Sequence, residues 1–485
     1  MKCIIELQDF KNMKLVGVDP STRRKCVDRL KFKIPNARFI PAVQIGRWDG
    51  TISLCSIGGN TYINLLPEVY EVLTKNGYDD IVLRDNRIGS SFQHDKIDNT
   101  LFKDHCWQGG KFDGESVTMM DHQVNAVNAL TDHDSATIVA STSSGKTLIC
   151  AALCKLTEKH GRTVTIVPNR DLVDQTYETY KMVGLDAGRI YHGTHELTHQ
   201  HTITTWQSLH SIKKKSKDQL TQEEIDSVVY NVKMVIQDET HLAAANVIFE
   251  INSKIFKDVP KSYGMTGTIP KDEHLRESIR ANFGDVVYTI PASELQDKGI
   301  LAKCEIQLHQ IIYDKMYNEY HDEKKAINND KRVIDILTND VLELIKSEDK
   351  SNTLILVENI DTGKLLEQNI PDSIFLSGSD KSKKRKEEYD SISEANDKVI
   401  IATYGIASTG ISINRLFNLI LFNPGKSFTR VIQSVGRGLR IAKDKDFVAI
   451  RDYSFSTKYS KRHLSERKKY YKESQYPFTI IKRSI

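Results

Sequence analysis

A loop between an apolar strand and an apolar helix carries the residues whose types and spacing most directly imply chemistry. The strand-like run 137–140 leads into Ala140-Ser141-Thr142-Ser143-Ser144-Gly145-Lys146-Thr147, and the apolar run 148–156 that follows is typical of a helix. A phosphate-binding loop requires this order of strand, loop, Gly-Lys-Thr and helix. Backbone amides would surround the phosphates, Lys146 would neutralise the outer ones, and the Thr147 hydroxyl would bind Mg²⁺.

This loop departs from the strict pattern G-x-x-x-x-G-K-T, because Ala140 stands at its first position. The alternative is an ordinary turn between a strand and a helix. Correct flanking elements favour phosphate binding over that alternative. The residues predicted to bind the nucleotide are Ser143, Ser144, Gly145, Lys146 and Thr147.

Two adjacent carboxylates follow another strand-like run, 232–237, about ninety residues further along the chain. They belong to Asp238-Glu239-Thr240-His241. Asp238 is placed to hold Mg²⁺ through water, and Glu239 to deprotonate the water that attacks the terminal phosphate. An acidic pair at a strand end is a helix cap equally often. The phosphate loop on the same chain favours the catalytic interpretation.

Alternating strands and helices must position these groups. Apolar strand-like runs separated by helical or turn segments lie at 137–141, 163–168, 201–205, 232–237 and 262–267, and a second series lies at 304–312, 352–358, 373–377, 398–403, 418–423 and 447–453. This rhythm predicts two parallel sheets in tandem, with ligands in a cleft outside the strand ends.

A smaller region precedes these two series. Short strand-like runs with one helical pattern at 66–76 indicate an α+β fold, and the polar stretch 95–114 reads as an irregular connection. We therefore expect an α/β protein with a small α+β domain at 1–110, a first parallel-sheet domain at 111–298 and a second at 299–485.

The phosphate loop and Asp238-Glu239-Thr240-His241 resemble motifs I and II of superfamily 2 helicases of the DExH type. The resemblance extends over roughly residues 117–455, and it implies two RecA-like domains, ATP as the nucleotide and Mg²⁺ as its metal. It also implies nucleotide contacts by His241 and by Gln123, which resembles the glutamine that reads the adenine edge. A lone glutamine would otherwise be a surface side chain.

Other motifs of that family occur in the expected order. Pro168, Arg170 and Gln175 resemble motif Ia, Thr205, Trp206 and Gln207 lie in a match to motif Ib, 266–268 resembles motif III, and 354–360 resembles motif IV. Thr403, Thr409 and Gly410 lie in a match to motif V, and Gln433, Arg437 and Arg440 lie in a match to motif VI.

The motif VI arginines are three residues apart, so they would share one helix face, where they could stabilise transition-state charge when the domains close. Two arginines on a helix more often form a solvated face. The ordered set of motifs favours the catalytic role for Gln433, Arg437 and Arg440.

Within superfamily 2 the chain resembles the phage branch-migration helicases of the UvsW kind. The resemblance lies in Gly46-Arg47-Trp48-Asp49-Gly50 and in the motif V run 408–412. The DETH sequence, Thr-Gly-Thr and a motif VI that begins with glutamine differ from the DEAD-box RNA helicases. Ser412 stands where many helicases have an acidic residue, so no interdomain contact by a carboxylate is expected at this position.

The resemblance implies that nucleic acid is gripped through its backbone, by residues that include Pro168, Arg170, Thr205, Trp206, Gln207, Ser377, Thr403 and Thr409. Net charge is only +4, but both ends are basic: residues 1–50 hold 11 Lys/Arg against 5 Asp/Glu, and 456–485 hold 9 against 2. The N-terminal domain could therefore clamp a fork through Arg47, with Trp48 stacking on an opened pair. Trp48 could instead be a core residue of the small domain. The tail from Lys458 to Arg483 interleaves basic residues, among them Arg467, with tyrosines that include Tyr471. This pattern is typical of a nucleic-acid surface and equally of a solvated amphipathic helix.

Composition excludes several other classes. No run of 18 or more uncharged apolar residues predicts a membrane span, and Glu6 and Asp9 interrupt any secretory signal, so we expect an intracellular protein, in the bacterial host if it is a phage protein. The seven cysteines show no C-x-x-C pair, so neither zinc nor disulfides are expected.

The sequence thus predicts an ATP-dependent DNA helicase that acts as a monomer. Its predicted activity is to unwind or branch-migrate forked or branched DNA in replication, recombination or repair. A duplex translocase subunit of a restriction or repair system and an RNA-directed helicase are the alternatives. A non-enzymatic scaffold is disfavoured, because Lys146, Asp238, Glu239 and both motif VI arginines are intact.

Overall fold

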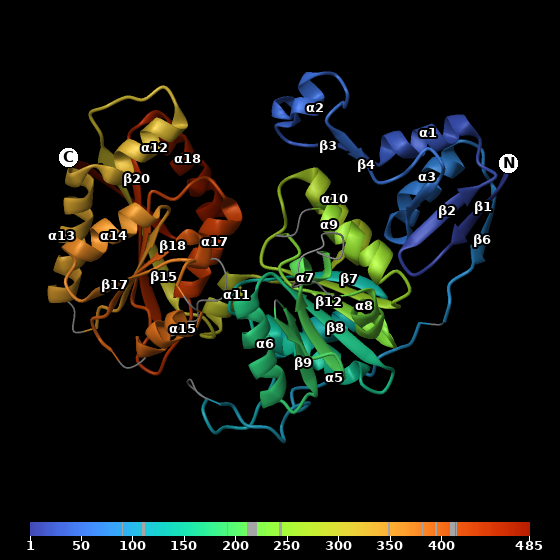
Figure 1. Ribbon diagram of the computed structural model, residues 1–485, viewed down its shortest axis with the longest axis horizontal. Coiled ribbons are helices and arrows are strands. Elements are labelled where there is room, and N and C mark those ends of the chain that lie inside the picture. Colours follow the sequence, from blue (N-terminus) through green and yellow to red (C-terminus); the bar gives the residue numbers. More distant parts are fainter. Residues whose placement is uncertain are drawn as a thin grey trace. The chain divides into compact units, whose positions relative to one another are not determined.

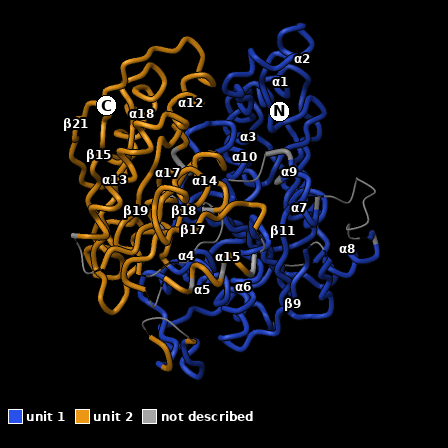
Figure 2. The backbone as a smooth tube through the Cα atoms, turned by 60° about the vertical axis from the view of Figure 1, so that its left-hand side comes forward, with its two compact units in different colours: residues 1–107, 115–140, 145–289 blue, residues 108–114, 141–144, 290–485 orange. Residues whose placement is uncertain are grey.

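The computed structural model describes residues 1–89, 91–108, 112–191, 193–210, 221–241, 245–347, 350–380, 382–392, 395–407, 413 and 415–485. The chain divides into two compact units (Figure 2). The first comprises residues 1–107, 115–140 and 145–289, and the second comprises residues 108–114, 141–144 and 290–485.

A small mixed sheet opens the first unit (Figure 1). Its strand order is β5-β2-β1-β6, with β1 antiparallel to β2 and parallel to β6. Alternate residues of β1 are buried, namely Cys3, Ile5 and Leu7, as expected of a strand with one face on a core. The elements are β1 (Lys2–Leu7), β2 (Asn12–Val16), α1 (Pro20–Arg29), β5 (Asn60–Tyr62), η2 (Ile63–Leu65), α3 (Leu66–Lys75) and β6 (Asp80–Asp85). The predicted small α+β fold is confirmed.

A hairpin with a compact loop interrupts this domain between α1 and β5. Its strands β3 (Lys31–Lys33) and β4 (Thr51–Ser53) are antiparallel, and the loop between them holds η1 (Ala37–Phe39) and α2 (Pro41–Gln44). Figure 1 shows β3 and β4 leading from the region of α1 to α2. We refer to residues 31–53 as the lobe.

The larger sheet of the first unit has the order β10-β9-β11-β8-β12-β13-β7-β14. The strands from β9 through β7 in this order are parallel to their neighbours, as the alternation of strands and helices predicts. The strands are β7 (Ser135–Ala140), β8 (Arg162–Val167), β9 (Ala187–Tyr191), β10 (Thr194–His195), β11 (His201–Thr205), β12 (Val232–Gln237), β13 (Lys261–Thr266) and β14 (Val286–Ile290).

Helices connect these strands in the way that a parallel sheet requires. They are α4 (Asp121–Thr131), α5 (Lys146–Thr157), α6 (Arg170–Met182), α7 (Trp206–His210), α8 (Gln222–Val229), α9 (Ala245–Glu250), the π-helical η4 (Ile251–Ile255) and α10 (Glu273–Phe283). The small N-terminal domain shares its core with this part of the unit, because Ala281 of α10 and Phe249 of α9 pack with the N-terminal apolar residues.

The second unit contains a parallel sheet of order β17-β18-β16-β19-β20-β15-β21. Its strands are β15 (Lys303–Ile312), β16 (Thr353–Val357), β17 (Ser373–Leu376), β18 (Val399–Thr403), β19 (Asn418–Phe422), β20 (Phe447–Phe455) and β21 (Phe478–Ser484). Its helices are α11 (Ala292–Asp297), α12 (Tyr320–Asn329), α13 (Lys331–Ser347), α14 (Ile360–Asn369), α15 (Ser382–Ser391), α16 (Tyr404–Ala407), α17 (Phe428–Gly438) and α18 (Lys458–Glu473). Two tandem parallel sheets are thus confirmed.

The basic C-terminal segment is part of this fold. Helix α18 packs its Arg467 and Tyr471 inward, where both bond to the carboxylate of buried Asp452, and β21 then adds an edge strand beside β15. The interpretation of Arg467 and Tyr471 as part of an exposed nucleic-acid surface is therefore wrong. Buried pairing with Asp452 explains their types instead.

The seven cysteines form no disulfide, and Cys150 and Cys154 are buried on α5. Among the described residues, no cluster of three or more His, Cys, Asp or Glu side chains could hold a metal ion by itself. No helix in the described part of the chain has the length and apolar character needed to cross a membrane.

Candidate nucleotide site and nucleic-acid interface

The carboxyl ends of five neighbouring strands bring the predicted motifs of the first unit to one edge of its sheet. Because the strands are parallel, the residues that follow them lie side by side in the order β11-β8-β12-β13-β7. The predicted nucleotide groups follow β12, β13 and β7, which are adjacent to one another. The predicted nucleic-acid groups follow β11 and β8. One sheet edge therefore carries both sets of predicted groups.

Lys146 lies in the first turn of α5, directly after Gly145, whose φ of 84° is left-handed. Its ammonium group donates to Ala140 O at 3.1 Å and lies 3.3 Å from Glu239 Oε1. Burial lowers the pKa of Lys146, but the nearby carboxylates of Glu239 and Asp238 outweigh burial and raise it overall. The lysine is thus a buried, charged group at the start of a helix, as phosphate binding requires.

Gln123 of α4 lies directly over the phosphate loop. A Cβ atom at Gly145 would come within 2.1 Å of Gln123 Nε2, so the glycine allows the amide to approach the backbone. The side-chain oxygen of Gln123 accepts a hydrogen bond from Met120 N at 2.9 Å, which orients the amide. The structure therefore brings the predicted adenine-reading glutamine against the predicted phosphate loop.

Asp238 and Glu239 form a buried pair after β12. Burial and the neighbouring Glu239 raise the pKa of Asp238. Burial also raises the pKa of Glu239, but Lys146, His241 and a backbone hydrogen bond from Gly267 lower it overall. The surroundings therefore favour the protonated form of Asp238 and the anionic form of Glu239.

His241 connects this pair to motif III. Its Nδ1 lies 2.6 Å from Thr266 Oγ1 and 3.4 Å from Glu239 Oε2. The Thr266 hydroxyl in turn donates to the carbonyl oxygen of Thr268 at 2.7 Å. Motifs II and III are thus joined through one hydrogen-bonded chain.

These groups fit ATP and Mg²⁺. Lys146 supplies a buried cation for the outer phosphates, and α5 begins with backbone amides and the half-buried Thr147. Asp238 supplies a carboxylate that a divalent cation would stabilise in its charged form. Hard oxygen ligands of this kind are those that Mg²⁺ prefers.

The predicted nucleic-acid residues of motifs Ia and Ib meet at the ends of β8 and β11. Gln207 Nε2 donates to Pro168 O at 3.1 Å, and Thr205 Oγ1 accepts from Ser208 N at 3.2 Å, which caps α7. Arg170 is exposed, with its guanidinium 4.7 Å from the Tyr191 ring centroid. Trp206, by contrast, is half-buried and packs against a hydrophobic cluster that includes Leu209 and Ile251.

In the second unit, Ser377 directly follows β17, and Thr403 ends the neighbouring strand β18. Ser377 is buried, and its hydroxyl bonds to Ser379 and Asp380. The unit also includes residues 141–144, and within it Arg440 Nε donates to Ser143 Oγ at 3.1 Å. Ser144 is buried in the same loop. Thr409, Gly410 and the side chains of Gln433 and Arg437 lie outside the described residues.

Sequence reasoning missed Lys445, which caps the motif VI helix. Its ammonium group donates to Gly438 O and Arg440 O, both at 2.5 Å, at the C-terminus of α17. Burial and the nearby Arg440 lower the pKa of Lys445 to about 7. A lysine within a polar loop gives no signal of such a role, because the partners are backbone carbonyls.

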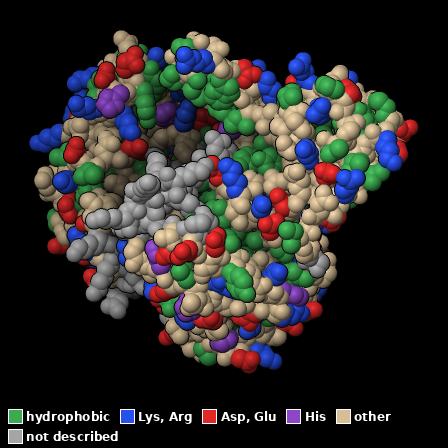
Figure 3. Space-filling model, turned by 45° about the vertical axis from the view of Figure 1, so that its right-hand side comes forward, with side chains coloured by type: hydrophobic (Ala, Val, Ile, Leu, Met, Phe, Trp, Pro, Cys, Tyr) green, Lys and Arg blue, Asp and Glu red, His purple; other side chains and the backbone are tan. Residues whose placement is uncertain are grey.

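Charge on the visible surface is mixed. Figure 3 shows Lys and Arg side chains interspersed with Asp and Glu on the face that it draws. In the lobe, Arg47 is exposed, whereas Trp48 is half-buried and its indole nitrogen donates to Thr51 O at 2.8 Å. The indole is thus already engaged within the lobe.

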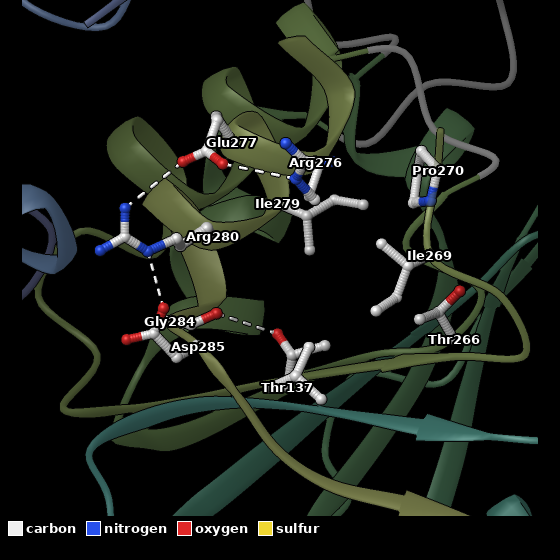
Figure 4. A pocket seen from close by; sticks show the side chains of 11 residues that line it. Thr137, Thr266, Ile269, Pro270, Arg276, Glu277, Ile279, Arg280, Gly284 and Asp285 are labelled. Atoms are coloured by element: carbon white, nitrogen blue, oxygen red, sulfur yellow. Dashed lines mark hydrogen bonds and ion pairs between the residues drawn. The ribbon is translucent and has the colours of Figure 1, made fainter. Parts of the chain in front are cut away.

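A cavity of about 220 Å³ lies beside motif III, between α10 and the start of β14 (Figure 4). Ile269, Ile279 and Val286 line it, and ion pairs among Arg276, Glu277, Arg280 and Asp285 border it. Thr266 is its one lining residue from the hydrogen-bonded chain of motifs II and III. The phosphate-site lysine and carboxylates are not part of this cavity.

Comparisons with known proteins agree with these motifs. Residues 116–271 match the family "Type III restriction enzyme, res subunit", and residues 336–442 match the "Helicase conserved C-terminal domain". The chain is 22% identical over 491 residues to the ATP-dependent DNA helicase uvsW of Enterobacteria phage T4, covering 96% of this chain and 93% of that protein.

Solved structures share the fold. A fragment of a putative HsdR subunit of a type I restriction enzyme from Vibrio vulnificus YJ016 matches with a TM-score of 0.57 at 17% identity, covering 75% of this chain and 68% of that one. The Mycobacterium smegmatis helicase Lhr matches with a TM-score of 0.53 at 16% identity, covering 74% and 49% of the two chains.

Proposed function

Because this chain belongs to helicase superfamily 2 and is an ATP-dependent helicase, we propose that it unwinds or branch-migrates forked or branched DNA in replication, recombination or repair. One observation carries the proposal: the nucleotide groups and the motif Ia and Ib groups share one edge of a single sheet. The phage relative, named as a DNA helicase, supports DNA as the substrate.

In the proposed hydrolysis step, Lys146 binds the outer phosphates and Glu239 accepts a proton from the attacking water. Glu239 suits this role because Lys146 and His241 lower its pKa. Thr147 and Asp238 would hold Mg²⁺, which supplies charge neutralisation to the phosphates. Gln433, Arg437 and Arg440 would stabilise the transition-state charge from motif VI, and Gln123, Ser143, Ser144, Gly145, His241 and Gly410 would complete the nucleotide site.

The DNA would contact the groups that follow β8 and β11, with further contacts from Ser377, Thr403 and Thr409. Arg170 is suited to a phosphate, because it is exposed and fixed at the start of α6. Backbone contacts of this kind do not read sequence. We therefore expect binding that is independent of sequence and sensitive to salt.

We further propose that residues 1–110 act as a DNA-binding domain on the fork, with 111–298 and 299–485 as the two motor domains. The protein would act as a monomer inside the cell, which is the bacterial host if it is a phage protein. The molar mass of the purified chain, measured by light scattering with and without forked DNA, tests whether it is a monomer.

A second candidate is a translocase that moves along duplex DNA without separating its strands. The match of residues 116–271 to the restriction-enzyme family favours it. The two activities differ in their products: a translocase displaces a bound third strand from duplex DNA, whereas a helicase releases a single strand from a fork.

The decisive experiment measures ATP hydrolysis with no nucleic acid, single-stranded DNA, forked DNA and RNA of matched sequence, together with strand release from the fork. We expect forked DNA to stimulate hydrolysis most, with strand release that requires ATP. The variant Glu239→Gln should lose both activities. Equal stimulation by RNA would overturn the DNA assignment, and stimulation without strand release would favour the translocase.

A further inference from the structure

The lobe exposes two large apolar side chains. Phe39 is 63% exposed and Ile45 is 62% exposed, one on η1 and the other at the end of α2. Exposed apolar groups on a small projecting element carry a cost in water and often mark a binding surface. Phe39 and Ile45 therefore mark the lobe as a candidate binding surface.

The loop of the lobe is held in one conformation by its own contacts. Ile34 N donates to Gly50 O at 2.9 Å, and Arg47 N donates to Ala42 O at 2.9 Å. A Cβ atom at Gly50 would come within 2.6 Å of Ala37 Cβ, so the two ends of the loop pack closely. Near the strands of the lobe, the indole nitrogen of Trp48 donates a hydrogen bond to Thr51 O. The exposed side chains thus stand on a folded support.

The same element is basic. Residues 31–53 contain Lys31, Lys33, Arg38 and Arg47 against Asp49 alone. Lys31 pairs with Asp49 at 2.7 Å, whereas Arg38 and Arg47 have no acidic partner in the part of the chain that the structure describes. The Arg38 guanidinium lies 4.8 Å from the Phe39 ring centroid. A cation stacked on an exposed aromatic ring suits a ligand that offers both phosphate and base surfaces.

We propose that the lobe engages the junction between duplex and single-stranded DNA, with Phe39 and Ile45 against the end base pair and Arg38 and Arg47 on the flanking phosphates. This inference rests on the proposed function and names the side chains that meet the fork. Phe39 takes the stacking role considered for Trp48, because the Trp48 indole is engaged within the lobe.

The principal test compares the full-length chain with the double variant Phe39→Ala, Ile45→Ala. Both side chains are exposed, so the variant should fold, which the midpoint of thermal unfolding checks. We expect ATP-dependent strand release from a fork to fall by roughly tenfold or more, because base stacking is lost. Hydrolysis stimulated by single-stranded DNA should stay within about twofold.

A matched control removes an apolar side chain outside the lobe. Ile57→Ala suits this purpose, because Ile57 is 57% exposed in the same domain. A second readout is 2-aminopurine fluorescence: wild type should change the signal of a probe at the junction pair more than that of a probe deep in the duplex, and the double variant should abolish this difference. Arg38→Gln with Arg47→Gln should weaken fork binding and reduce its salt dependence.

Unchanged strand release by the double variant, or an equal loss in Ile57→Ala, would overturn the inference while leaving the proposed function intact. Failure of wild type to release any DNA strand would overturn both. If the double variant released strands normally but lost binding to another protein, the lobe would be a protein-binding surface and the DNA assignment of the lobe would be wrong.

Discussion

Lys146 Nζ lies 3.3 Å from Glu239 Oε1, and both side chains are largely buried. The pair joins the first residue of α5 to the second residue after β12, so the cation of the phosphate loop and the proposed base hold each other in their charged forms. A phosphate bound by Lys146 would compete with Glu239 for this ammonium group. The carboxylate would then be available to a water molecule.

Glu239→Gln should reduce ATP hydrolysis by roughly 10² to 10⁴-fold, because the amide cannot accept the proton of the attacking water. Nucleotide binding should persist, since Lys146 and the loop backbone remain. Steady-state hydrolysis and fluorescent-nucleotide binding measure the two effects. The control is Glu223→Gln on the exposed surface of α8. Retained hydrolysis in Glu239→Gln would exclude this residue as the base.

Gln123→Ala should raise the KM for ATP by roughly tenfold with little change in kcat, because one or two hydrogen bonds to the base are lost. Preference for ATP over GTP should fall in parallel. Hydrolysis of both nucleotides by the variant checks this expectation. Asn125→Ala, on the exposed face of the same helix, is the matched control and should behave as wild type. An unchanged nucleotide preference would assign Gln123 to capping α4 alone.

Lys445→Met should lower kcat for DNA-stimulated hydrolysis by roughly tenfold while the KM for ATP changes little. Without the ammonium group, the buried carbonyls of Gly438 and Arg440 lose their donor, which costs about 1 to 3 kcal/mol at the end of the motif VI helix. Lys445→Arg should restore part of the activity. Lys443→Met, an exposed neighbour, is the control. A loss confined to thermal stability would limit Lys445 to a structural role.

Most of the fold could be predicted because its strands are continuous apolar runs. Residues 232–237 and 418–422, for example, are buried on both faces of their sheets and read as strands from composition alone. The site was predictable for a related reason. Gly145 and Lys146 lie at the end of the loop after β7, and Asp238 and Glu239 come after β12, so the parallel topology brings them to one edge.

The remaining features depend on contacts between distant segments. Strand β21 combines three apolar residues with two adjacent basic ones, so only its pairing with β15 distinguishes it from a basic tail. Arg467 reads as a surface residue until Asp452 is placed beside it. Lys11 likewise reads as exposed, although it is buried against Ser262 of β13. Buried charges of this kind carry no local signal in sequence.

Arg467→Met should destabilise the second unit by about 3 to 5 kcal/mol, because it leaves the buried Asp452 carboxylate without its cation. Loss of the bond from Arg467 to Pro424 O would also loosen the segment before α17. Chemical denaturation followed by circular dichroism measures the effect. Arg462→Met, exposed on the same helix, should change stability little. A loss of similar size in both variants would contradict the importance of the buried pair.

Lys11 should make stability depend on pH. Burial lowers its pKa from 10.5 to about 7, against the opposing effects of Asp9 and Asp134. Between pH 7 and 10.5 the unfolded chain would bind a proton that the folded chain has lost, so the free energy of unfolding should rise with pH, by up to about 5 kcal/mol.

Lys11→Met removes this titration and should flatten the rise, and at pH 7 and below it should stabilise the chain, because no ammonium group has to be buried. The measurement is the thermal unfolding midpoint from pH 6 to pH 10 for wild type, Lys11→Met and the exposed control Lys33→Met. The control should retain the slope of wild type. If the unfolding midpoint of Lys11→Met rose with pH as steeply as that of wild type, other groups would cause the pH dependence of stability. Lys11 would then stay charged in the folded chain.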